Sequence, residues 1–169
     1  MSIGTKRLCH IAVVVKDIER AVENWSQVLG LPKAEIFSLP PKEKVPAFTH
    51  GSLGDYSDVK LAVYELENCK IELAQPGSKP SPWKDMLDKH GEGVQHLSFI
   101  VPDRKSAQDQ LKAIGAGVPY HIGYWPGGTY SFTDTVKQLG VEINIKTDDD
   151  NTAKREDLLR DSGFHKKDL

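Results

Sequence analysis

The sequence predicts an α+β fold built from two βαβββ modules, because one pattern of strand, helix and three further strands occurs twice along the chain. Each copy begins with a short apolar run that is rich in β-branched residues and contains a histidine. A helical pattern follows, with an aspartate before it and a glycine after it. At 169 residues the chain is long enough for one domain of two similar halves but hardly for two independent domains.

The first copy starts with the predicted strand Leu8 to Val15. Asp17 then stands where an N-cap carboxylate accepts free backbone amides, and apolar positions recur at helical spacing up to Gly30, which suits a left-handed residue at the helix end. The sequence predicts three further strands, at about 34–38, 59–64 and 69–75. We therefore assign residues 8–76 to the first module.

The second copy repeats these signals with an offset of about 86 residues, which is the separation of His10 and His96. Its first strand is predicted at Val94 to Val101, its helix begins after Asp103, and Gly115 ends that helix. The remaining strands are predicted at about 118–122, 129–133 and 140–146. The second module is therefore residues 94–146, and both modules form a single domain over 8–146.

Two segments lie outside the modules. Ser81 and Pro82 are typical of a capped helix start, and Gly91 of its end, so a short helix is expected to link the modules and shield the mouth of the cavity. Residues 147–169 are densely charged and contain few apolar side chains, which favours a solvated helical tail.

The amino-acid composition limits the classes of molecule that the protein is expected to bind. The chain has 22 basic and 24 acidic residues and a formal charge of −2, which gives no electrostatic case for a nucleic acid or an anionic membrane and favours a small-molecule ligand. No apolar run approaches the roughly 20 residues that span a bilayer, and Met1 to Arg7 has no apolar signal core, so a cytoplasmic location is expected. Cys9 and Cys69 are interpreted as buried thiols.

Four side chains are candidates for one metal site. Side chains alternate across a strand, so His10 faces away from the larger apolar set that should cover the helix, and the same argument applies to Glu72, His96 and Glu142. Taken singly, a strand histidine is more often structural and a glutamate more often solvated. Both types, however, occur at equivalent positions of the two modules, where burial of a carboxylate is costly without a cation. The sequence therefore predicts one divalent metal ion held by His10, Glu72, His96 and Glu142.

Two longer motifs resemble a known family. HIAVVVKDIERAVENWSQVLGL and SPWKDMLDKHGEGVQHLSFIV are similar to segments of the vicinal oxygen chelate (glyoxalase/bleomycin resistance/dioxygenase) superfamily, and most similar to its methylmalonyl-CoA epimerase-like members. The resemblance covers about residues 8–146. It implies paired βαβββ modules that form a curved mixed sheet around a metal-binding cavity. It also implies the same four ligands, His10, Glu72, His96 and Glu142.

The resemblance implies proton transfer next to a carbonyl. Two imidazoles and two carboxylates suit Zn, Co, Ni, Mn or Fe, and the sequence does not distinguish among them. An epimerase or isomerase of this type would take a carbonyl substrate such as an acyl-CoA or a thiol adduct, with Glu142 or Glu72 as the base. On the third strand of the first module such epimerases are expected to have a second carboxylate, and this chain has Lys60 there. Lys60 could return a proton to the opposite face or pair with a substrate carboxylate or phosphate, and a solvated lysine is the alternative.

Other functions stay open at this point. A glyoxalase I-like lyase would use the same metal and the same bases, whereas a second ligating glutamate argues against an extradiol dioxygenase. A ligand-sequestering protein of the same fold is a non-catalytic alternative, although such proteins typically lack the full ligand set. His50, His121 and Tyr130 are further candidates for contacts around the metal or the substrate. The resemblance also implies a homodimer, in which exchange of modules could build each site from two chains.

Overall fold

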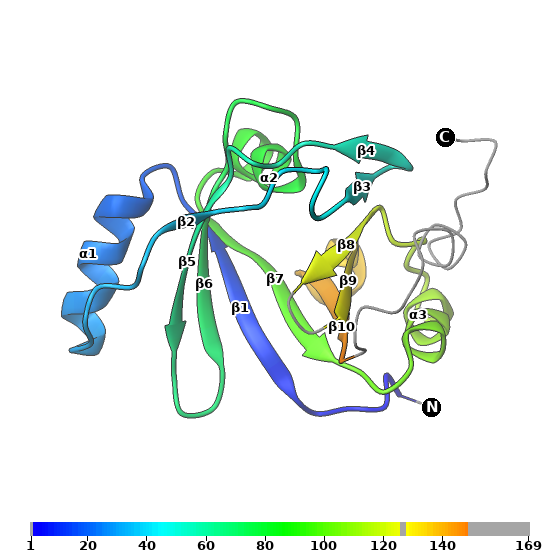
Figure 1. Ribbon diagram of the computed structural model, residues 1–169. Coiled ribbons are helices and arrows are strands. Elements are labelled where there is room, and N and C mark those ends of the chain that lie inside the picture. The colour runs from blue at the N-terminus through cyan, green and yellow to red at the C-terminus, as the bar shows by residue number, and fades with distance from the viewer. Residues whose placement is uncertain (1, 126–127, 149–169) are drawn as a thin grey trace.

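The computed structural model of the protein describes residues 2–125 and 128–148. The first module contains β1 (Leu8–Val14), α1 (Ile18–Leu29), β2 (Phe37–Ser38), β3 (Ala47–Thr49), β4 (Ser52–Gly54), β5 (Lys60–Glu65) and β6 (Lys70–Gln75). α2 (Pro82–His90) links it to the second module, which contains β7 (Gly93–Ile100), α3 (Arg104–Ala113), β8 (His121–Trp125), β9 (Gly128–Thr133), α4 (Val136–Leu139) and β10 (Glu142–Thr147). These strands form one sheet in the order β2-β5-β6-β1-β7-β10-β9-β8-β3-β4, which curves as Figure 1 shows.

The two modules have the same strand pairing. In each, the first strand pairs parallel to the last, as β1 does with β6 and β7 with β10. The last strand in turn pairs antiparallel with the strand before it, as β6 does with β5 and β10 with β9. The first strands of both modules, β1 and β7, join antiparallel at the centre of the sheet. The predicted α+β fold of paired βαβββ modules in a curved mixed sheet is confirmed.

The helices form where the predicted caps stand. The Asp17 carboxylate accepts a hydrogen bond from the Arg20 amide at 3.0 Å, and the Asp103 carboxylate accepts one from the Ser106 amide at 2.6 Å. Gly30 ends α1 with φ 66°, a left-handed conformation that costs glycine little. α1 packs on the outer face of β5 and β6, and α3 packs beside β10, at opposite sides of the molecule in Figure 1.

The structure differs from the prediction at four strands. β2 is reduced to two residues, and β8 begins at His121 rather than at 118, because Pro119 has no backbone N–H to donate to a ladder. The hairpin of β3 and β4 was not predicted at all. It turns at His50 (φ 48°) and Gly51 (φ 79°), and β3 extends the sheet of the second module by pairing with β8.

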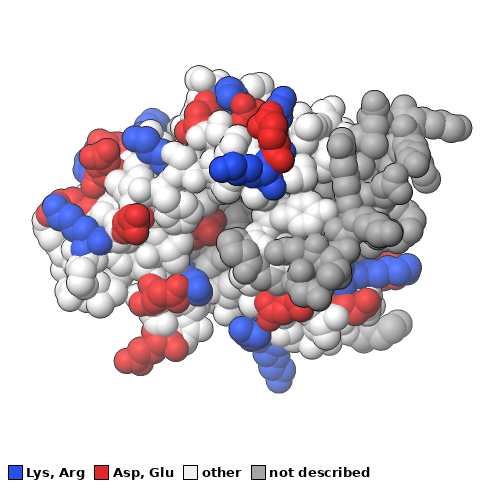
Figure 2. Space-filling model, viewed as in Figure 1, with Lys and Arg blue, Asp and Glu red and all other residues white. Residues whose placement is uncertain are grey.

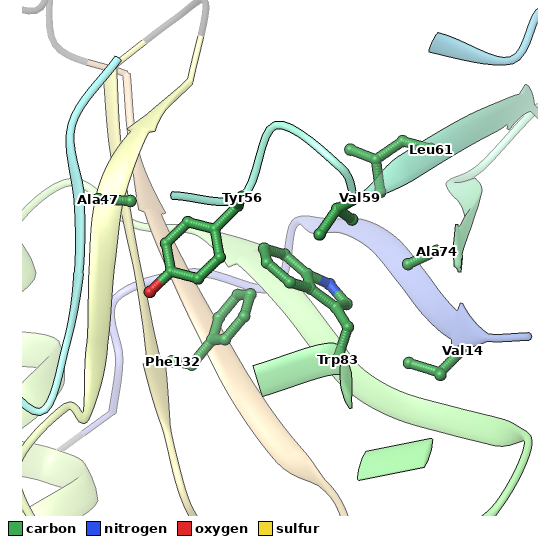
Figure 3. Packing of buried hydrophobic residues seen from close by; sticks show 8 residues of the cluster. All are labelled: Val14, Ala47, Tyr56, Val59, Leu61, Ala74, Trp83 and Phe132. Atoms are coloured by element: carbon green, nitrogen blue, oxygen red, sulfur yellow. The ribbon is translucent and has the colours of Figure 1, made fainter. Parts of the chain in front are cut away.

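A cluster of buried side chains fills part of the inner face of the sheet. Trp83 of α2 lies at its centre, next to Tyr56 and Phe132, as Figure 3 shows. The centroid of its ring is 5.8 Å from that of Tyr56 and 5.9 Å from that of Phe132. α2 begins as predicted, because the Ser81 hydroxyl accepts a hydrogen bond from the Lys84 amide and Pro82 is the first helical residue. α2 therefore fixes an aromatic side chain against the inner face of both modules.

None of the helices in the described ranges combines the length and the apolar character needed to cross a bilayer. The predicted charged tail lies outside the described residues beyond Asp148.

Candidate metal centre

Three of the four predicted ligands meet on the inner face of the sheet. The ligand atoms of His10, Glu72 and His96 all lie within 4.8 Å of one another. The Nε2 atoms of His10 and His96 are 2.9 Å apart, and His10 Nε2 lies 3.9 Å from a Glu72 oxygen. Strand register produces this convergence, because Ala12 of β1 is paired with Glu72 on one side and with His96 on the other. Two imidazole nitrogens and a carboxylate oxygen are a donor set that suits zinc and other first-row divalent ions.

Gln95 determines which nitrogen of His96 carries the proton. The pairing of β1 with β7 shifts register between Ala12 and Val13, and Gln95 is the additional residue on β7. This irregularity allows Gln95 to face the same interior as His96. The Gln95 amide nitrogen donates to the Pro82 carbonyl at 3.1 Å, so its oxygen lies 3.3 Å from His96 Nδ1 and can only accept. His96 Nδ1 is therefore the protonated nitrogen, and Nε2 keeps a lone pair for a metal.

Both histidines are held neutral by their surroundings. Burial, together with the positive charges of Lys146 and Lys70, lowers the pKa of His10 to about 3. Burial also lowers the pKa of His96 well below its ordinary value, and the neighbouring His10 adds to this effect. Neutral imidazoles are the form that binds metal ions, so the cluster fits a divalent cation near neutral pH.

Glu142 lies beside the cluster but does not join it. It is paired with His96 in the register of β10 and β7, which places both side chains on the same face. Its carboxylate accepts a hydrogen bond of 2.7 Å from the Tyr120 hydroxyl. Burial raises the pKa of Glu142 to about 7, against the opposing effect of the Tyr120 hydrogen bond. A role of Glu142 as the fourth ligand or as the base stays a prediction.

The structure does not bring Lys60 to the cavity. Its strand neighbour Leu61 lines the cavity, so alternation directs Lys60 to the α1 side of β5. There its ammonium group lies 4.0 Å from the Glu19 carboxylate of α1, and the side chain is 44 % exposed. The surroundings of Lys60 are therefore those of the solvated lysine that was the alternative for this position.

A cavity of about 730 Å³, within the usual range for small-molecule sites, opens over His10 and Glu72 of the cluster. His10, Glu72, Asn144 and Lys146 are the polar groups that β1, β6 and β10 contribute to its wall. The rest of the wall contains the polar residues Ser38 and Lys44, of which Lys44 is exposed, and is otherwise apolar and aromatic: Phe37, Leu39, Pro40, Val45, Pro46, Ala47, Tyr56, Leu61, Trp83, Tyr124, Trp125, Tyr130 and Phe132. On the face shown in Figure 2, basic and acidic side chains alternate instead of gathering by sign.

Two cavity tyrosines are joined by a buried hydrogen-bonded chain. His121 is fully buried, and its Nε2 lies 2.9 Å from the Tyr130 hydroxyl. Its Nδ1 lies 2.8 Å from the Thr49 hydroxyl, which also contacts the Tyr56 hydroxyl. Burial lowers the pKa of His121 to about 3, so the ring is neutral. This chain ties the β3–β4 hairpin to β8 and β9 and fixes one wall of the cavity.

Comparison with known proteins agrees with this architecture. The profile of the Glyoxalase/Bleomycin resistance protein/Dioxygenase superfamily matches residues 9–132. The chain belongs to this superfamily. The matched residues include His10, Glu72 and His96.

Several of the similar proteins are named epimerases. The chain is 34 % identical over 113 residues to the ethylmalonyl-CoA/methylmalonyl-CoA epimerase of Cereibacter sphaeroides, a match that covers 66 % of this chain and 73 % of that protein. It is 34 % identical over 101 residues to the mitochondrial methylmalonyl-CoA epimerase of Mus musculus, covering 60 % of this chain but only 48 % of the longer mouse protein.

Solved structures show the same fold. Methylmalonyl-CoA epimerase from Mycobacterium tuberculosis superposes with a TM-score of 0.58 at 20 % identity and covers 88 % of this chain and 91 % of its own. A Streptomyces coelicolor methylmalonyl-CoA epimerase in complex with 2-nitronate-propionyl-CoA gives a TM-score of 0.57 at 21 % identity, covering 83 % and 96 %.

Several residues of the site were missed from the sequence. Gln95 was not predicted to face the cluster, because strand alternation without the register shift directs it to the other face. Tyr120 was not singled out, since its contact with Glu142 depends on how β8 approaches β10. Lys146 could have been found, because alternation from Glu142 through Asn144 places it on the inner face.

Proposed function

We propose that the protein is a divalent-metal-dependent epimerase or isomerase that moves a proton alpha to a carbonyl, on a carboxylated acyl thioester such as methylmalonyl-CoA. The convergence of His10, Glu72 and His96 at a cavity of small-molecule size is the observation that supports it most directly. The names of the similar proteins support the substrate class.

In this proposal His10, Glu72 and His96 hold the metal, and Glu142 is the fourth ligand or the proton acceptor. A bound divalent ion supplies Lewis-acid stabilisation of negative charge on the substrate carbonyl. Rotation of the Glu142 side chain away from Tyr120 would direct its carboxylate toward neighbouring His96. Glu72, which already lines the cavity, is the other available carboxylate.

The aromatic wall has a separate role in this proposal. Trp83, Tyr56 and Phe132 exclude water from the inner face, and a drier cavity strengthens every electrostatic interaction in it. Removal of a proton from carbon needs that help, because a carboxylate in water is a weak base for a carbon acid.

The test joins metal analysis with proton exchange. The untagged protein is purified, its metal is measured by elemental analysis, and methylmalonyl-CoA is incubated with it in deuterated buffer. Near-stoichiometric metal together with deuterium at the carbon between the two carbonyls supports the proposal. Metal without exchange redirects the search to a glyoxalase-like lyase and its thiol adducts. No metal under any reconstitution contradicts the metal centre and favours a ligand-sequestering protein.

A further inference from the structure

Lys146 of β10 lies on the inner face of the sheet, four residues beyond Glu142, and lines the same cavity as His10 and Glu72. On β10 the side chains of Asn144 and Lys146 both line the cavity. Asn144 is paired with Ser98 of β7 and accepts a hydrogen bond from its hydroxyl at 3.1 Å, and Ser98 is paired with His10. A short polar row thus connects His10 to β10, and Lys146 is the next inward-facing residue along that strand.

The charge of Lys146 is not neutralised within the described part of the chain. Seven other described lysines each have a carboxylate within 4.0 Å: Lys33, Lys60, Lys70, Lys79, Lys84, Lys89 and Lys105. Lys44, the other lysine of the cavity wall, is an exposed residue at which water screens the charge. For Lys146 no carboxylate of residues 2–125 or 128–148 lies within that distance. Its ammonium group instead lies 4.6 Å from the ring centroid of Trp125, another residue of the cavity wall.

The contact with Trp125 orients the Lys146 ammonium group and leaves it able to bind an anionic ligand. A cation over an indole face is held in place without losing its positive charge or its hydrogen-bond donors. The Lys146 side chain is only half-buried, and the surrounding wall is largely aromatic. An anionic group of a bound molecule would therefore meet an oriented ammonium in surroundings of low polarity, where ion pairing is strong.

We propose that Lys146 recognises a carboxylate of the substrate, so that the cavity selects carbonyl compounds that bear a carboxylate near the carbon losing its proton. In this proposal the cation that pairs with the substrate carboxylate, one of the roles considered for Lys60, comes from the second module. The proposal deepens the proposed function and rests on it, because it names the group that separates a carboxylated acyl thioester from a plain one. Lysine suits this task as a compact point charge with three donors.

The experiment compares two thioesters that differ by one carboxylate, methylmalonyl-CoA and propionyl-CoA. Their dissociation constants are measured by calorimetry or by quenching of tryptophan fluorescence, since Trp83 and Trp125 both line the cavity. The protein is the full chain, reconstituted with Co²⁺, in the wild type and in the variants Lys146→Met, Lys146→Arg and Lys112→Met. Lys112, an exposed residue of α3, is the matched control outside the cavity.

The wild type and Lys112→Met are expected to bind methylmalonyl-CoA about tenfold or more tightly than propionyl-CoA, as one charge-assisted contact predicts. Lys146→Met should remove most of that ratio while the affinity for propionyl-CoA stays the same, and Lys146→Arg should keep part of it. An unchanged ratio in Lys146→Met, or no binding of either ester by the wild type, overturns the proposal. Binding that depends on Lys146 without deuterium exchange would leave this inference standing and refute the epimerase function.

Discussion

The Nε2 atoms of His10 and His96 lie 2.9 Å apart, although 86 residues separate the two histidines in the chain. Both rings are buried and neutral, so at most one of the two facing nitrogens can donate a hydrogen to the other. Because Gln95 places the His96 proton on Nδ1, a metal between the rings requires only that His10 also present a lone pair. The pair is therefore arranged for an ion with little change of the backbone.

His10→Ala is expected to lower the amount of bound metal from near one equivalent per chain to about a tenth of an equivalent. The reason is that a metal site that loses one of its ligating side chains loses most of its affinity. Elemental analysis after dialysis against excess Zn²⁺ measures this. His50→Ala is the matched control, since His50 is an exposed histidine that stacks on Tyr120 and is not part of the cluster. Equal metal in both variants would contradict the assignment of His10.

Gln95→Leu should weaken the affinity for Co²⁺ or Zn²⁺ by about 10- to 100-fold, which is typical for loss of a partner that orients a ligating histidine. The physical reason is that His96 loses the acceptor for its Nδ1 proton and can take the other tautomer. Competition with a chelator of known affinity gives the dissociation constant. Gln95→Glu keeps an acceptor for His96 but loses the donor to the Pro82 carbonyl, so it should recover part of the affinity. Unchanged affinity in Gln95→Leu would contradict the assigned role of Gln95.

Glu142→Gln should lower the rate of deuterium exchange by about 100-fold or more, the usual range for loss of a general base. Lys60→Met should change that rate by no more than about twofold, because Lys60 lies on the α1 side of β5 beside Glu19, where surface substitutions have small effects. Mass spectrometry of methylmalonyl-CoA after timed incubation in deuterated buffer measures both. A large loss in Lys60→Met would show that the lysine reaches the substrate by a route absent from this structure.

The sequence predicted those features that depend on local pattern. Asp17 and Asp103 cap helices as expected. Side-chain alternation along β1 and β7 predicted that His10 and His96 face the interior of the sheet, where the structure has them. The curvature of the sheet and the pairing of the modules were predicted from the superfamily resemblance.

Features that depend on contacts between distant strands were not predictable in this way. The β3–β4 hairpin has a His50-Gly51 turn in place of the common Asn-Gly or Asp-Gly signal, and its stability comes from pairing with β8. The register shift at Gln95 similarly depends on β1. A contact of Lys60 with the substrate was suggested only by the family resemblance, whereas side-chain alternation in β5 turns Leu61 to the cavity and Lys60 to the opposite face.

Acid should destabilise the protein through His121. Its pKa of about 3 in the folded state lies below the value of about 6.5 expected in the unfolded chain. Between these two pH values the unfolded state binds more protons, so the free energy of unfolding falls as pH falls from about 6.5 toward 3. Lowering the pH from 6.5 to 5 should therefore cost about 2 kcal/mol from this one residue. Urea unfolding at several pH values, with a chelator present to remove metal, measures the slope.

The variant His121→Gln separates this effect from the other buried histidines. Glutamine does not titrate, so the variant should lose less stability than the wild type between pH 6.5 and 5, by about 2 kcal/mol. It should also be less stable at pH 7, because Thr49 and Tyr130 lose well-placed partners in the chain that fixes the cavity wall. His10 and His96 are present in both proteins, so their contributions cancel in the difference. Parallel pH profiles for the two proteins would show that His121 is protonated in the folded state, contrary to its burial between Thr49 and Tyr130.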